Sequence, residues 1–180
     1  MNNAEKTSST VRADDVVRAD WLPRMDFVVD GPPARVWPLV LNWNSWIQDR
    51  RSEHFSGEPD TVGAIRKISK LDEDGNSGSP SFTQLVRVEP NRRLVSRILP
   101  PDGAPEGEGL WGYTIFNLHD LGEKTLVCYE TVAEMRSSTL SAVDVEESVG
   151  EKSHRETERI WAEKYIPQLR KLLLERGKNR

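Results

Sequence analysis

The sequence predicts an α+β fold, in which an antiparallel sheet of about six to seven strands is followed by one long C-terminal helix. Strand-like segments follow one another through the middle of the chain with only turns between them. Helical spacing is confined to a short region after the first strand and to the region after Ser141. Strands that cluster apart from helices are typical of α+β proteins, so a parallel βαβ arrangement is not expected.

Length and composition indicate one domain with a tail. Residues 1–22 are polar and have no sustained period, which predicts a flexible N-terminal tail. Residues 23–177 are then expected to form a single domain. The formal net charge of −4 leaves no basic stripe to neutralise phosphates. A nucleic-acid partner is therefore not expected.

The sequence also bears on compartment and assembly. A single cysteine, Cys128, excludes an intrachain disulfide. No secretory signal is visible, and no apolar run approaches the length of a membrane span. We therefore expect a soluble cytoplasmic protein. The sequence leaves the oligomeric state open between a monomer and a homodimer.

The first strand and the helices after it are predicted from a proline-rich, tryptophan-rich segment. Phe27–Val29 is an aromatic and β-branched run that favours a strand. Pro32 and Pro33 suit the first turn of a helix, where a missing N–H is tolerated. Pro38 indicates short helices or a break. The apolar residues that recur at helical spacing here are Val36, Leu39, Val40 and Trp43.

Further strands are expected from residue 53 onward. Glu53–Glu58 is predicted as a short edge strand, and the strand after Gly63 leaves the direction of Arg66 ambiguous. Residues 100–109 are rich in proline, glycine and acid, which predicts a loop of the lid or gate type. A hairpin is expected around Asp120–Lys124. In the strand that follows the acidic, glycine-rich turn at 72–80, one face is expected to hold Phe82, Gln84, Val86 and Val88.

The C-terminal region is predicted as one long helix. Ser141 with Asp144 three residues later resembles a capping box, and a terminal glycine suits the helix end. Pro167 predicts a kink. One face of this helix is expected to hold His154, Thr157, Trp161, Tyr165, Leu169 and Leu172.

Short motifs in this element order resemble the START-related superfamily, the helix-grip fold of the birch-pollen allergen and of bacterial polyketide cyclases. The opening resembles the family's strand, proline turn and Val–Trp pair, and the hairpin of residues 117–125 resembles the family's later hairpin. The match covers about residues 24–175 in element order. The motif residues are Val29, Gly31-Pro32-Pro33, Val36-Trp37, Asn42, Trp43, Trp46 and Val62-Gly63-Ala64.

The resemblance implies a curved antiparallel sheet that wraps the long C-terminal helix, with a cavity between them. Two positions depart from the family pattern. Asn42 stands where the family often has an acidic residue after the first helix, and Gln84 stands where a charged residue often opens the fourth strand.

No cofactor or metal is expected from the sequence. The three histidines have no ligand partners at two- to four-residue spacing, and one cysteine cannot supply a structural zinc site. Neither a nucleophile elbow nor a phosphate-binding loop is present. Cys128 is interpreted as a small core residue.

With metal and nucleophile sites set aside, the leading hypothesis is that the protein binds a hydrophobic, aromatic or polycyclic small molecule in an internal cavity. Trp43 and Trp46 are expected to lie opposite Trp161, although core packing would explain these side chains about as well. The predicted ligand-binding residues are Trp43, Trp46, Trp111, Tyr129, Trp161 and Tyr165.

The alternative hypothesis is a cofactor-independent cyclase/aromatase, dehydratase or isomerase, so the sequence leaves open whether the protein is an enzyme. His154 is the best candidate for proton transfer if it faces the cavity. The simpler alternative is that His154 lies on the exposed N-terminal half of the helix and has no catalytic role. By analogy with the cyclases it resembles, Arg66 and Tyr113 would hold a substrate and polarise its carbonyls, although each also fits an ordinary sheet residue. A third class, an interaction protein, would need an exposed apolar patch and little cavity volume.

Overall fold

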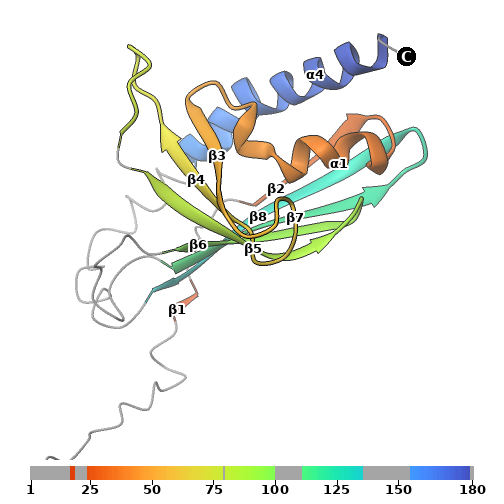
Figure 1. Ribbon diagram of the computed structural model, residues 1–180. Helices are drawn as coiled ribbons and strands as arrows, with labels where there is room; N and C mark the ends of the chain where they lie inside the picture. The colour runs from red at the N-terminus through yellow and green to blue at the C-terminus, as the bar shows by residue number, and fades with distance from the viewer. Residues whose placement is uncertain (1–16, 19–23, 79, 100–110, 136–154, 179–180) are drawn as a thin grey trace, which may run out of the picture.

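The computed structural model describes residues 17–18, 24–78, 80–99, 111–135 and 155–178, and it has helices on one side of a curved antiparallel sheet (Figure 1). The expected α+β architecture, with short helices after the first strand of the domain, is confirmed. The strands are β1 Val17–Arg18, β2 Arg24–Asp30, β3 Arg50–Ser56, β4 Ile65–Lys70, β5 Ser81–Glu89, β6 Arg93–Leu99, β7 Trp111–Asp120 and β8 Lys124–Met135.

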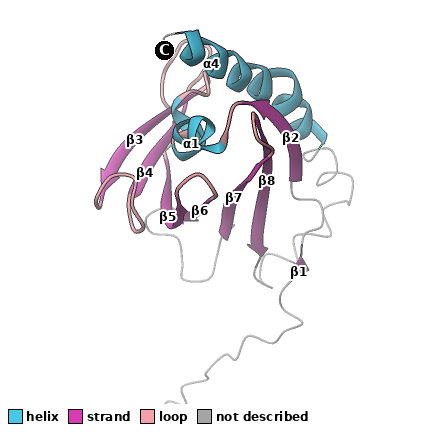
Figure 2. Cartoon of the chain, turned by 90° about the vertical axis from the view of Figure 1, so that its right-hand side faces the viewer, coloured by secondary structure: helices cyan, strands magenta, loops and turns pink. Residues whose placement is uncertain are grey.

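The sheet is antiparallel throughout, and its first two strands along the chain, β1 and β2, pair with its last strand, β8. The strand order is β1-β8-β7-β6-β5-β4-β3, and β2 also pairs with β8. β2 lies opposite residues 124–130 of β8, and β1 lies opposite residues 134–135 of the same strand. β3 is therefore the other edge of the sheet. The helices α1, Pro33–Leu41, and α4, Ile166–Lys178, both lie over the same face of the sheet, here called the inner face (Figure 2).

A bulge in β5 changes which residues face inward. The pairing register with β6 shifts between Leu85 and Arg87, so Val88 lies opposite the buried Leu94 and packs against the core. Phe82, on the other side of the bulge, contacts the ring of the exposed Phe55 instead. One extra residue reverses the alternation of a strand. The expectation that Phe82, Gln84, Val86 and Val88 share one face is therefore wrong.

The helices after β2 are short, as the prolines predicted. α1 covers Pro33–Leu41 and begins with proline in its first turn. Pro38 lies inside α1 with its ring exposed to solvent, and the helix continues past it for one turn, to Leu41. The 3₁₀ turn η2, Trp43–Ser45, follows directly and carries Trp43 to the inner face of the sheet.

The C-terminal helix contains a π turn immediately before its proline. Helical residues 155–160 lead into the π turn η3, Trp161–Tyr165, and α4 continues over Ile166–Lys178. Pro167 has no N–H to donate and crowds the turn before it, and the wider π turn accommodates this. The wider turn also keeps residues four apart on one face, so Leu173 is buried while the expected Leu172 is half-buried.

The core fills the space between the inner face and the helices at the end near α1. Its aliphatic members come from β2, α1, the sheet and α4, and they exclude solvent almost completely. No helix among the described residues is long and apolar enough to cross a membrane. The residues of this packed end include Val29, Val36, Val40, Leu85, Leu94, Leu118, Val127, Leu169 and Leu173.

Some expectations fall outside the described residues. These are the loop at 100–109, the capping box at Ser141, and His154. Of the predicted tail, residues 17–18 are described, and they form β1 against the end of β8.

Candidate functional site

A pocket of about 380 Å³ lies between the inner face of the sheet and the first described turns of the C-terminal helix. It continues the same layer as the packed core but is not filled by side chains. Residues from η2, from strands β3 to β8 and from the C-terminal helix contribute to its walls. The lining residues are Trp43, Asn44, Arg50, Ile68, Ser81, Thr83, Ile98, Thr114, Tyr129, Thr131, Thr157, Ile160, Trp161 and Tyr165.

One wall of the pocket is a cluster of aromatic rings in mutual contact. The rings of Trp43 and Trp161 stack with centroids 6.2 Å apart and planes 27° apart. The ring of Tyr129 lies 4.4 Å from that of Trp161, and the ring of Tyr165 meets Trp161 edge-on at 5.4 Å. Phe116 supports the cluster from behind through Trp43. Such a packed cluster presents a rigid apolar surface that suits a flat ligand ring.

The sheet contributes hydroxyl groups to the opposite wall. Thr114 of β7 lies directly opposite Thr131 of β8, and both line the pocket. Ser81 and Thr83 add two further hydroxyls from β5. Because side chains alternate along a strand, these residues all point to the inner face. The pocket can therefore hydrogen-bond oxygen atoms of a ligand along this wall.

Tyr129 joins the two walls and offers a proton. The hydroxyl of Thr131 donates a hydrogen bond to the Tyr129 phenol oxygen at 3.0 Å. Burial raises the pKa of Tyr129, while the Thr131 hydrogen bond and the charge of Arg50 lower it to a lesser extent. The phenol is thus neutral at physiological pH, and its own proton is available to an acceptor in the pocket.

Arg50 is the charged residue of the pocket wall, and sequence reasoning did not identify it. Its guanidinium carbon lies 5.5 Å from the centre of the Trp43 ring, and Nη1 donates to Asn44 Oδ1 at 3.2 Å. Among the described residues, no carboxylate oxygen lies within 4.0 Å of this guanidinium. The available signal was an arginine shortly after a tryptophan pair, at the start of a strand.

Tyr165 separates the pocket from a second groove on the outside of the helix. Its hydroxyl donates to the Asp49 carboxylate, with the nearer oxygen at 3.3 Å. Burial raises the pKa of Tyr165, the charge of Arg50 lowers it, and Asp49 raises it. The second groove has a volume of about 550 Å³, and its charged lining residues are Asp49, Lys164, Lys171 and Glu175.

Four of the six predicted ligand-binding residues line the pocket: Trp43, Tyr129, Trp161 and Tyr165. Trp46 is not among the lining residues. It packs against the core, and its indole N–H donates to the Leu39 carbonyl at 2.9 Å. It therefore does not lie opposite Trp161 as Trp43 does. The side chain of Trp111 is outside the described residues.

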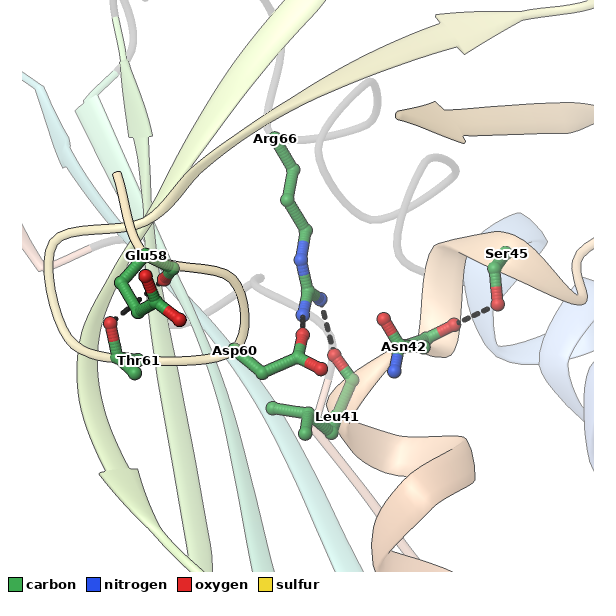
Figure 3. A network of polar contacts seen from close by, with 7 residues as sticks. All are labelled: Leu41, Asn42, Ser45, Glu58, Asp60, Thr61 and Arg66. Atoms are coloured by element: carbon green, nitrogen blue, oxygen red, sulfur yellow. Dashed lines mark hydrogen bonds and ion pairs between the residues drawn. The ribbon is translucent and has the colours of Figure 1, made fainter. Parts of the chain in front are cut away.

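The structure places Arg66 on the inner face but away from the pocket lining. Its guanidinium donates to the Leu41 carbonyl at the end of α1 and pairs with the Asp60 carboxylate, as Figure 3 shows. A cation at a helix C-terminus is electrostatically favourable. Arg66 therefore ties the loop between β3 and β4 to the end of α1, and its catalytic role stays a prediction.

Tyr113 and Cys128 lie on the outer face of the sheet. Tyr113 precedes Thr114 on β7, so the alternation that turns Thr114 into the pocket turns Tyr113 away from it. Its catalytic role also stays a prediction. Cys128 is half-buried, and burial together with the neighbouring Asp26 raises its pKa to about 11, which keeps it a thiol. Within the described ranges, no three His, Cys, Asp or Glu side chains gather to hold a metal ion.

Comparison of the sequence with family models and with curated proteins finds no match. The structure, however, is similar to solved structures. Ara h 8.0201 aligns with a TM-score of 0.59 and 10% identity, over 86% of this chain and 97% of that chain. The di-domain ARO/CYC StfQ from the steffimycin biosynthetic pathway aligns with a TM-score of 0.58 and 12% identity, over 87% of this chain and 52% of that chain.

A third similar structure is norcoclaurine synthase from Thalictrum flavum, a point mutant in complex with a transition state analogue. It aligns with a TM-score of 0.56 and 12% identity, over 90% of this chain and 98% of that chain. Identities this low show the fold and nothing finer. The helix-grip fold expected from the short motifs is thereby confirmed.

Proposed function

We propose that this protein binds an aromatic or polycyclic hydrophobic small molecule in the pocket between the sheet and the C-terminal helix. The observation that carries the proposal is the contrast between the two sides of the pocket. A rigid cluster of Trp43, Trp161, Tyr129 and Tyr165 forms one wall, and a row of sheet hydroxyls faces it. A concave, mostly apolar site with a few convergent polar groups is the usual form of a small-molecule site.

The chemistry of the walls defines the kind of ligand. Stacked tryptophan rings favour a flat ring system, and the threonine and serine hydroxyls favour ring oxygens on its other edge. The similar structures support this class, since one is an ARO/CYC protein of a biosynthetic pathway and another holds a transition state analogue. An interaction protein with little cavity volume is disfavoured by the 380 Å³ pocket.

The test is a titration of the intrinsic tryptophan fluorescence with a panel of aromatic ligands and lipids, including the neutral fluorescent probe N-phenyl-1-naphthylamine. Because Trp43 and Trp161 line the pocket, a bound aromatic ligand is expected to quench the tryptophan fluorescence, and the quenching should reach a plateau as ligand is added. Thr83→Phe, which fills the pocket, should weaken binding by at least about tenfold.

Gln84→Phe is the matched control, because Gln84 neighbours Thr83 on the same strand but is not among the residues that line the pocket. It should bind the probe like the natural chain. No saturable quenching by any compound, or equal binding by Thr83→Phe and the natural chain, would overturn the proposal.

A second candidate is a cofactor-independent cyclase/aromatase, dehydratase or isomerase in the same pocket. The observation that favours it is that Tyr129, with an available phenol proton, and Arg50, with a positive charge, both line this pocket, and such groups polarise carbonyls. His154 as a general base stays a prediction. The test incubates the protein with linear poly-β-ketones and uses mass spectrometry to follow cyclised products that have lost water. Tyr129→Phe should then lower turnover more than it lowers binding.

A further inference from the structure

Arg50 brings a positive charge to an otherwise neutral pocket. Of the described residues that line the pocket, none is acidic. The Asp49 carboxylate accepts a hydrogen bond from the Tyr165 hydroxyl and lines the second groove, and the charges of Asp49 and Arg50 both act on that hydroxyl. The other inner-face arginine, Arg66, is neutralised by Asp60. Among the described residues, no carboxylate oxygen lies within 4.0 Å of the half-buried Arg50 guanidinium, so a ligand anion can supply its direct counter-charge.

We propose that the ligand is an aromatic carboxylate, and that Arg50 is the residue that binds its negative group. This inference rests on the proposed binding function and names the chemical class of its ligand. Arg50 lies beside the aromatic cluster, so a ring stacked there can place an attached carboxylate on the guanidinium. The planar fork of arginine matches the two oxygens of a carboxylate.

The guanidinium is oriented before any ligand arrives. The Trp43 ring lies under it at 5.5 Å, and the Asn44 amide oxygen accepts one of its five N–H groups at 3.2 Å. Asn44 is itself only 5% exposed, so this hydrogen bond lies within the structure and not at its surface. A guanidinium fixed by two neighbours loses little conformational freedom when it binds an anion.

The remaining polar groups of the pocket fit the same ligand. Tyr129 offers a phenol proton, and the sheet hydroxyls offer neutral donors and acceptors. These groups can hydrogen-bond ring oxygens, but none carries a positive charge. Arg50 is therefore the residue that we expect to give a carboxylate ligand a higher affinity than its neutral amide.

The experiment uses N-phenyl-1-naphthylamine as a neutral reporter of the pocket and displaces it with 2-naphthoate or with the neutral isostere 2-naphthamide. In the natural chain, 2-naphthoate should displace the reporter at a concentration at least about tenfold lower than 2-naphthamide. Arg50→Gln should bring this ratio close to one while the reporter still binds. Arg50→Lys, which keeps the charge without the fork, should retain part of the preference.

Arg51→Gln is the matched control, because Arg51 is the next residue of β3, exposed and outside the pocket lining. It should keep the full preference for 2-naphthoate. Equal displacement by acid and amide in the natural chain, or an unchanged ratio in Arg50→Gln, would overturn the inference and leave the binding function standing. A reporter that does not bind the natural chain at all would overturn both.

If Arg50→Gln does not fold, the natural chain alone decides. An acid preference that declines with salt supports the inference, and a salt-independent ratio near one overturns it.

Discussion

The two ends of the layer between sheet and helix are built from the same strands and the same helix, yet one is packed and the other is a pocket. At the packed end the sheet contributes Phe116 and Leu118 from β7, and the helix contributes Leu169 and Leu173. At the pocket end β7 contributes Thr114, and the helix contributes Thr157 and Ile160. Along β7 the inward side chains therefore change from apolar, at Leu118 and Phe116, to hydroxyl-bearing, at Thr114.

The antiparallel register places these changes at the same level of the sheet. Thr114 of β7 is paired with Thr131 of β8, and two residues further along β7, Phe116 is paired with Tyr129. Aliphatic side chains fill space and exclude water, whereas hydroxyls are tolerated where a hydrogen-bonding partner can reach them. One continuous layer is therefore packed for stability at one end and open at the other, where the proposed function places the ligand.

The largest expected effect is a loss of stability from a substitution at the packed end. Leu169→Ala removes a side chain that is 2% exposed and leaves a cavity among the core residues. We expect a loss of about 2–5 kcal/mol in the free energy of unfolding, measured by urea denaturation. Ile160→Ala, on the same helix at the pocket end, should lose only about 1 kcal/mol because its side chain is already half-buried beside open space. Equal losses in the two variants would contradict the contrast between the two ends.

The next effect concerns the junction that leads from the sheet to α1 at the packed end. Thr125 is fully buried, and its hydroxyl donates to the Gly31 carbonyl at 2.7 Å. Thr125→Val leaves that carbonyl without this donor, so we expect a loss of about 1–3 kcal/mol in the free energy of unfolding. Thermal denaturation measures it. Thr61→Val is the control, since the Thr61 hydroxyl makes a similar bond to the Glu58 carbonyl at 2.8 Å in solvent. A control that loses as much as Thr125→Val would show that burial is irrelevant.

The smallest effect sharpens the account of the pocket end and appears only at high pH. Burial raises the pKa of Tyr129 above its ordinary value near 10. The unfolded chain then releases this proton at lower pH than the folded chain, so stability is full below about pH 10 and declines as the pH rises through the folded pKa. Urea denaturation at a series of alkaline pH values should show a shallower decline for Tyr129→Phe. Identical slopes would mean that the phenol is not desolvated.

Much of the fold was predictable because its signals are local. Proline position predicted the short helices, alternation predicted the strands, and helical spacing brought Trp161, Tyr165 and Leu169 to one face. Leu173 was missed because a π turn is not visible in an apolar pattern. Val88 was placed on the wrong face because a single bulge reverses the alternation of β5.

The candidate site was predicted in part, and the misses share one cause. Trp43 and Trp161 were expected on the pocket wall, because large apolar rings at inward positions have few other places to lie. Arg66 and Arg50 could not be told apart by composition. Pairing of β3 with β4, and the distance of each guanidinium to Asp60 or to Trp43, separates the anchored arginine from the one in the pocket.

The sequence by itself therefore determined the element order, the antiparallel sheet, the long helix and the aromatic character of the layer between them. These follow from propensities and periodicities within a few neighbouring residues. Tertiary structure alone decided which end of that layer stays open and that Arg50, not Arg66, lines the open end. The reason is physical: a bulge, a π turn and the strand register each act through contacts between residues far apart in the chain, and no local pattern contains those distances.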